Sequence, residues 1–236
     1  LCNTGGDRAE TLRYLQAVNQ KQVDGIVLVG SVFDTICQGA EMEKLLSGVP
    51  VVLANGKLDL PNAYSVTVDD KYGVSLAVEH LVARGRKNIY YIKDRDTDSA
   101  KSKRDGFLEA MRRNGLEFAD HVLEAGETLA SGMETVQALL AQGIVPDGIV
   151  CGEDLTAAGA LKALLRAGLR VPGQVAVVGF NNSDYAHLCE PVLTSVDNKP
   201  EQVALLCVQL LESSIERSEA YSSVVLQPEL AQGETS

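Results

Sequence analysis

Residues 148–182, GIVCGEDLTAAGALKALLRAGLRVPGQVAVVGFNN, form the stretch that decides the fold class of this chain. The apolar run at 148–151 is too short for a helix and is bounded by polar residues, so it predicts a strand. Leucines at helical spacing follow, and Gly168 suits the end of that helix. The run at 175–178 does not alternate, which is typical of a strand covered on both faces. The stretch therefore predicts two parallel strands joined by a helix.

Polar side chains follow each of these two strands. Glu153 and Asp154 come after the first strand, and we expect Asp154 to be the N-cap of the helix. Asn181 and Asn182 come after the second strand. Neighbouring parallel strands end at the same edge of a sheet, where open α/β sheets bind their ligands. We therefore expect a ligand site at this edge.

The rest of the chain repeats this alternation of short apolar runs and helical patterns. The clearest helix lies at 74–82, where apolar residues recur at i, i+3, i+4, i+7 and i+8. We expect 66–68 to be an edge strand and 229–236 to be a polar tail. Further helices are expected around 12–18, 41–46, 107–111, 133–140, 184–188 and 200–211, and further strands at 1–3, 23–29, 49–54, 89–92, 121–123, 193–196 and 224–226.

This number of strand–helix units fits poorly into one sheet. The sequence therefore predicts an α/β protein with two doubly wound parallel-sheet lobes. We expect residues 1–86 and 198–222 to form the N-terminal lobe. Residues 87–197 and 223–236 would form the C-terminal lobe. The chain would cross between the lobes at 84–87 and 195–200.

Composition excludes several classes of function. The formal net charge of -11 argues against a grip on nucleic acid by this segment, which requires clustered lysine and arginine. The chain has no run of 18 apolar residues, so we expect no membrane span. Its five cysteines are scattered and contain no C-x-x-C pair, which favours free thiols and a cytoplasmic location.

Enzyme motifs are also missing from the sequence. We find no nucleotide-binding glycine motif and no G-x-S-x-G elbow. His80, His121 and His187 are far apart in sequence, and the Asp69–Asp70 pair is typical of a helix start. We therefore expect no catalysis, no cofactor and no metal.

Four segments in register resemble the effector-binding domain of the LacI/GalR family of transcription regulators. They are the opening stretch at 148–182, VTVDDKYGVSLAVEHLVARGRKNIYYI at 66–92, the segment 102–115 and EPVLTSV at 190–196. The similarity covers nearly the whole chain with the spacing of the family.

The resemblance implies a periplasmic-binding-protein-like type I fold, in which a small effector binds in a cleft between two lobes. The effector, commonly a sugar or a nucleobase, would alter a homodimer and thereby its binding to operator DNA. The DNA-binding headpiece is absent from this chain. By the same resemblance, we expect the first strand and helix of the family's effector domain to be missing before Leu1.

By position in the family motifs, the expected effector-binding residues are Asn55, Ser99, Lys103, Thr128, Glu153 and Asn181. Three of them depart from the family: Glu153 replaces a usual Asn, Asn181 a frequent Asp, and Lys103 a usual Arg. Each also has a structural reading. Asn181 would cap the turn to the next helix. Glu153 would pair with a nearby cation or interact with the positive end of the following helix. Lys103 would belong to a solvated charge run at a helix start. An aromatic platform for a sugar would come from Phe33, Tyr185 or a segment outside the chain.

Two further expectations follow from the resemblance. A dimer would pack the helix at 155–169 and the segment 187–191 across a two-fold axis. The alternative function on the same fold is the periplasmic solute-binding protein of a sugar transporter, which would be a monomer with few free thiols.

Overall fold

The computed structural model describes residues 1–216 and 223–236; the end of the expected N-terminal-lobe segment 198–222 therefore lies outside the described residues. The chain divides into two compact units. Unit 1 contains Leu1–Val68, Thr97–Ser99 and Lys199–Leu226, and unit 2 contains Asp69–Asp96, Ala100–Asn198 and Gln227–Ser236. Each unit has a mainly parallel sheet between helices, which confirms the predicted α/β class.

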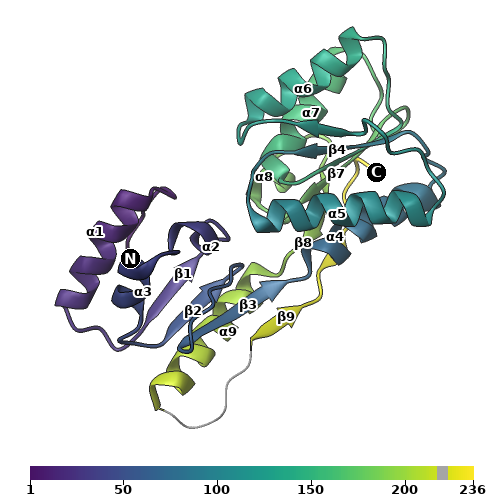
Figure 1. Cartoon of the computed structure of the whole chain (residues 1–236). Helices are drawn as coiled ribbons and strands as arrows, with labels where there is room; N and C mark the ends of the chain where they lie inside the picture. Colours follow the sequence, from purple (N-terminus) through teal and green to yellow (C-terminus); the bar gives the residue numbers. More distant parts are fainter. Residues whose placement is uncertain (217–222) are drawn as a thin grey trace. The chain divides into compact units, whose positions relative to one another are not determined.

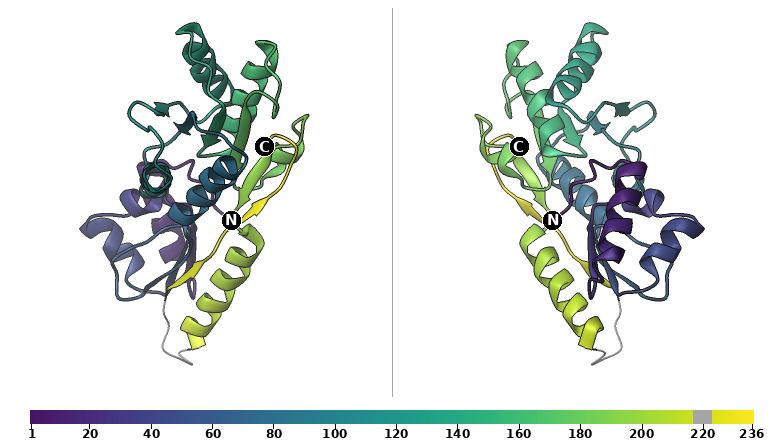
Figure 2. Two further views of the ribbon diagram at one scale, coloured as in Figure 1. Left: turned by 90° about the vertical axis from the view of Figure 1, so that its right-hand side faces the viewer. Right: turned by 90° about the vertical axis from the view of Figure 1, so that its left-hand side faces the viewer.

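Unit 1 is built on a parallel four-stranded sheet in the order β1-β2-β3-β9 (Figure 1). Val51 and Leu53 of β2 pack in one core with residues of α1 and α3, while Val52 and Ala54 pack in another with residues of α9. These helices cover opposite faces of the sheet, with α1 and α3 (purple to blue) on one face and α9 (yellow-green) on the other (Figure 2). Continuous burial along β2 explains why its sequence does not alternate. The elements of unit 1 are β1 (Ile26–Val29), β2 (Val51–Ala54), β3 (Ala63–Val68), β9 (Val224–Leu226), α1 (Arg8–Gln20), α2 (Phe33–Ile36), α3 (Ala40–Leu46) and α9 (Pro200–Glu216).

Unit 2 is built on a six-stranded sheet in the order β10-β8-β7-β6-β4-β5, in which only β10 runs antiparallel to its neighbour. Helices α4 and α5 cover one face of this sheet, and α6 and α7 cover the other (Figure 1). Its strands are β4 (Ile89–Lys93), β5 (Val122–Glu124), β6 (Gly148–Cys151), β7 (Ala176–Phe180), β8 (Thr194–Asp197) and β10 (Glu229–Ala231). Its helices are α4 (Asp70–Ala83), α5 (Asp98–Arg113, whose first two residues group with unit 1), α6 (Leu129–Ala141), α7 (Asp154–Arg166) and α8 (Asp184–His187).

The unit boundaries differ from the expected lobes. Helix α4 belongs to unit 2, because Val74, Val78 and Leu81 pack in its core. The chain therefore passes between units after Val68 and not at 84–87, whereas a later passage, after Asn198, falls within the predicted stretch 195–200. Strand β9 belongs to unit 1, where it pairs with β3.

Three local predictions were wrong for related reasons. Strand β3 lies between β2 and β9 and is not an edge. Residues 1–3 form no strand. The expected polar tail contains β10, paired with β8, and Thr235, which is fully buried against β7 and β8. The pairings of β3 with β9 and of β10 with β8 join segments that are distant in sequence, so local patterns do not reveal them. None of the helices in the described part is both long and apolar enough to cross a bilayer.

Candidate functional site

Polar residues gather at one edge of the unit 2 sheet, as the sequence predicts. Strands β6, β7 and β8 are parallel neighbours, so their carboxyl ends meet at this edge. Glu153 lies two residues beyond β6, Asn181 directly follows β7, and Asn198 directly follows β8. We call Lys103, Glu153, Asn181 and Asn198 the strand-end chain, because hydrogen bonds and an ion pair connect them in that order.

The contacts of the strand-end chain run from a charged end to a neutral end. Lys103 Nζ lies 3.6 Å from Glu153 Oε1. Asn181 Nδ2 donates to Glu153 Oε2, and Asn198 Nδ2 donates to Asn181 Oδ1 at 2.8 Å. Three residues with separately predicted roles, Lys103, Glu153 and Asn181, therefore hold one another in place, and the amides of Asn181 and Asn198 have a fixed orientation.

Lys103 is buried, with 5% of its surface exposed. Its ammonium donates to the carbonyl oxygen of Gly152 at 2.9 Å and lies 3.9 Å from the centre of the Phe180 ring. A buried charge is tolerated when it is paired and hydrogen-bonded. These contacts supply both conditions and add a cation–π interaction. The reading of Lys103 as part of a solvated charge run is therefore wrong.

A second carboxylate lies behind this edge. Asp94, which directly follows β4, is buried and accepts a hydrogen bond from Thr156 Oγ1 at 3.3 Å. Burial raises the pKa of the Asp94 carboxyl, and the negative charge of Glu153 raises this pKa further, while Lys103 opposes the shift. The charge of Lys103 therefore interacts with two carboxyl groups, those of Glu153 and Asp94.

Asp154 has a structural role that the sequence analysis misassigned. The N-cap of α7 is Glu153, whose side chain makes no capping bond, and Asp154 is the first residue of the helix. Its carboxylate accepts from Ser195 Oγ at 2.6 Å and from the N–H and Oγ of Ser183 at 2.7 and 2.8 Å. Burial raises the pKa of Asp154 and these hydrogen bonds oppose that rise. Asp154 therefore ties α7 to β8 and to the turn after β7.

The turn after β7 has an unusual backbone. Asn181 has φ of 102° and Asn182 has φ of 50°. Positive φ is uncommon outside glycine, although asparagine tolerates it better than most residues. The turn is held by Asn181 N–H donating to the Val196 carbonyl at 2.8 Å and by Asn182 Nδ2 donating to Asp197 Oδ2 at 3.3 Å. Asn181 does not cap the next helix, because Ser183 holds the N-cap of α8.

The other expected site residues lie elsewhere. Asn55, in unit 1, follows β2 with φ of 55°, and its N–H donates to the Val66 carbonyl at 2.8 Å. Ser99 lies in the first turn of α5 and groups with unit 1. Thr128 is the N-cap of α6 in a reciprocal capping box with Ser131. The strand-end chain as the structure describes it contains none of these three residues, and their effector roles stay predictions.

Asn198 and Phe180 are the site residues that the sequence analysis missed. Asn198 follows the next parallel strand, so the rule that selected Asn181 also selects Asn198 once β8 is known to lie beside β7. Phe180 follows the predicted strand at 175–178 and had no predicted role, but its ring supports Lys103. The aromatic candidates lie elsewhere: Phe33 is buried in the unit 1 core, and Tyr185 is 51% exposed on α8.

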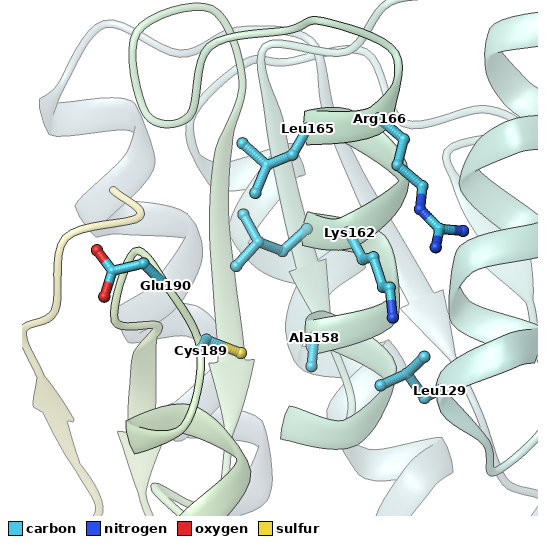
Figure 3. A pocket seen from close by; sticks show the side chains of 8 residues that line it. Leu129, Ala158, Lys162, Leu165, Arg166, Cys189 and Glu190 are labelled. Atoms are coloured by element: carbon cyan, nitrogen blue, oxygen red, sulfur yellow. The ribbon is translucent and has the colours of Figure 1, made fainter.

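A separate groove of about 430 Å³ lies on the surface of α7 (Figure 3). Leu165 projects from the helix toward the segment that carries Cys189 and Glu190 (Figure 3), and Leu161 also lines the groove. Leu188 of the same segment is 80% exposed. This groove coincides with the two segments expected at a dimer interface.

His80 is held in its neutral form. Arginine can only donate, so His80 Nδ1 accepts from Arg84 Nη1 at 3.0 Å, and the His80 Nε2–H donates to Ser236 Oγ at 2.8 Å. Burial, and then the charge of Arg84, lower the pKa of His80 to about 4. Among the residues that the structure describes, no group of three or more metal-ligating side chains is found.

Comparisons with known proteins agree on one family. A family model described as a periplasmic binding protein-like domain matches residues 78–236. An HTH-type transcriptional regulator of Lachnoclostridium phytofermentans is 32% identical over 214 residues, which cover 89% of this chain and 64% of that protein. The chain thus spans less than two-thirds of this relative.

Solved structures extend the likeness to nearly the whole chain. A complex of the transcriptional regulator CelR with cellobiose aligns with a TM-score of 0.85 at 27% identity, covering 97% of this chain and 70% of that chain. A LacI transcriptional regulator from a Rhodococcus species aligns with a TM-score of 0.82 at 31% identity, covering 94% and 81%. These relatives are named as transcription regulators and not as transport proteins. The chain belongs to the periplasmic binding protein-like family, as an effector-binding domain of the LacI/GalR regulators.

Proposed function

We propose that this chain is the sensor part of a cytoplasmic bacterial transcription regulator and that the strand-end chain of unit 2 contacts its small-molecule effector. The observation that carries the proposal is the ordered set of Lys103, Glu153, Asn181 and Asn198 at the carboxyl ends of three neighbouring parallel strands. Ligands bind at such edges because several loops bring polar groups together there. The CelR structure contains cellobiose, which favours a sugar-like effector.

The site has the features of binding and not of catalysis. Lys103 is held by three neighbouring groups, so its amine is unsuited to act as a nucleophile. The two amides offer fixed donors and acceptors, which suit recognition of hydroxyl or N–H groups. In the full-length protein, the effector would shift the balance between two conformations of the regulator and so change operator binding through a separate headpiece.

The test is a thermal-shift screen of the chain against neutral sugars, including cellobiose, and nucleosides. A ligand at about 100 times its dissociation constant stabilises the native state by roughly 2.7 kcal/mol. For a chain of this size, each kcal/mol raises the melting temperature by about 2–4 °C. A selective rise with one chemical class supports the sensor function. A flat response to the whole panel would count against it.

We also propose that the regulator is a homodimer that uses the groove on α7. The groove is lined by Ala158, Leu161 and Leu165 of α7 together with the charged Lys162, Arg166 and Glu190, and exposed Leu188 lies on the adjacent segment. Exposed apolar side chains bordered by charged ones are typical of a protein interface. A two-fold axis would bring the same segments of two copies together.

A further inference from the structure

We propose that Glu153 makes this site selective for uncharged ligands rich in hydrogen-bond donors and excludes anions such as phosphates and sugar phosphates. The inference rests on the proposed function and specifies the chemical class of the effector. It follows from the different exposure of the two charged side chains, because Lys103 is buried and Glu153 is partly exposed. The sequence alone does not determine this exposure.

The positive charge of Lys103 is directed into the protein. Its ammonium contacts the Gly152 carbonyl, Glu153 Oε1 and the Phe180 ring, and 7% of its side chain is exposed. An ammonium has three donors, and these inward contacts occupy it. Lys103 is therefore poorly placed to clamp an anion, in contrast to the role that its position in the sequence suggested.

The exposed charge of the pair is the negative one. The Glu153 side chain is 27% exposed, about four times the exposure of Lys103. A carboxylate offers about four lone-pair directions. Lys103 and Asn181 account for one contact on each oxygen, so each oxygen retains capacity for a further donor. A hydroxyl or N–H group of a ligand would meet these two acceptors.

Neighbouring acids strengthen the same preference. Asp94 is buried behind Glu153, and each carries an unfavourable charge interaction with the other. Asp154 is adjacent in sequence and buried. Lys103 pairs with Glu153, and Asp94 and Asp154 each interact unfavourably with the Glu153 charge, so the local potential does not favour an incoming anion even with Arg95 acting on Asp94. A neutral ligand avoids this repulsion and gains the charge-assisted hydrogen bonds of Glu153.

Substitution of Glu153 by Gln tests the inference without knowledge of the natural effector. Gln keeps the size of the side chain and removes the charge that offsets Lys103. We expect Glu153→Gln to bind inorganic phosphate at least tenfold more tightly than the wild type by isothermal titration calorimetry at low salt. Glu134→Gln is the matched control, because it makes the same change in net charge on an exposed residue of α6.

A double variant tests whether the gain in phosphate affinity depends on Lys103. Adding Lys103→Met, which keeps the length and apolar contacts of the side chain, should return phosphate binding to the wild-type level. If this variant melts early, Lys103→Gln replaces it. The inference is overturned if the wild type binds phosphate as tightly as Glu153→Gln, or if the gain persists without Lys103. A flat screen with neutral ligands would instead count against the proposed function and leave this charge comparison standing.

Discussion

Asn181 combines a strained backbone with two side-chain hydrogen bonds. Its φ of 102° lies in the region that favours glycine, yet its amide bridges Glu153 and Asn198. Strain of this kind costs on the order of 1–3 kcal/mol and is concentrated at functional sites. A substitution at Asn181 can therefore change effector binding and protein stability to different extents.

The substitution Asn181→Gly should weaken effector binding while changing stability little. Glycine removes the amide contacts but adopts positive φ freely, so the two effects on the free energy of unfolding oppose each other. Loss of one ligand hydrogen bond typically costs about 0.5–1.5 kcal/mol, or roughly 2- to 12-fold in affinity. Calorimetric titration with a ligand found by the thermal-shift screen measures the change. Unchanged affinity would remove Asn181 from the site.

His80 should make the stability of unit 2 dependent on pH. Its pKa is about 4 in the folded protein, below the 6.5 that is usual for a histidine side chain. The unfolded chain therefore takes up a proton first as the pH falls, so stability is fully present above pH 6.5 and declines toward pH 4. His80→Gln should flatten this part of the pH profile of the unfolding free energy. Parallel profiles for the two proteins would contradict the assignment.

For single residues, the sequence predicted where the site residues lie better than it predicted which residues they contact. The rule that polar residues follow parallel strands selected Glu153 and Asn181. It could not predict that Glu153 bonds Asn181 and Lys103, since these residues come from three different elements. Asp154 was read as a helix cap because its type suits that role, but Ser183 and Ser195 use its carboxylate instead.

Helices α6 and α7 approach each other closely through glycines. A Cβ at Gly159 would lie 2.2 Å from the Leu129 carbonyl oxygen and 2.9 Å from the Met133 nitrogen. Both neighbours are backbone atoms and cannot rotate away. The two helices therefore pack this closely because residue 159 has no side chain.

Substitution of Gly159 by Ala should lower the free energy of unfolding by about 1–3 kcal/mol, as is typical for overpacking. Chemical denaturation measures the change. Gly48→Ala is the control, because a Cβ at that position has open space and its φ is not positive. Equal stability of the two variants would show that α6 and α7 separate easily.

The segment that contains β10 is integral to unit 2. Thr235 Oγ1 donates to the Val177 carbonyl at 2.7 Å and accepts from the Thr194 N–H at 2.9 Å. Thr235→Val would leave that buried N–H without its acceptor, so we expect a loss of about 1–3 kcal/mol in the free energy of unfolding. Thr235→Ser keeps the hydroxyl and should lose much less. A Thr235→Val variant as stable as the wild type would contradict this role of the hydroxyl.

The order of elements was largely predictable, while their pairing across long separations was not. The apolar runs of β2, β4, β6 and β7 and the periodic face of α4 follow local rules. Whether α4 joins the first or second unit depends on which core its valines enter, and a helical face does not specify that. The same holds for β9 and β10, which are short and pair with strands distant in sequence.

At the scale of the whole molecule, the exposed apolar surface of α7 and its neighbouring segment predicts assembly. Leu165 is 42% exposed, Tyr185 51% and Leu188 80%. We expect Leu188→Glu to shift the protein from dimer toward monomer, because it would bury a charge in an apolar interface. Light scattering coupled to gel filtration measures the mass. Val145→Glu, at an exposed valine of the α6–β6 loop, is the control.

A monomeric wild type at high concentration would contradict the dimer proposal. A Leu188→Glu variant that stays dimeric would instead move the interface away from the groove on α7. Either result leaves the strand-end chain untouched, because that set of contacts lies at the ends of β6, β7 and β8.

The location of the effector is tested most directly by hydrogen–deuterium exchange with and without the sugar or nucleoside that gives the largest thermal shift. We expect new protection of the backbone at 152–154 and 181–183, where the ligand would contact Glu153 and Asn181. Protection confined to other segments, such as α7 and 187–191, would contradict the account and place the effector elsewhere.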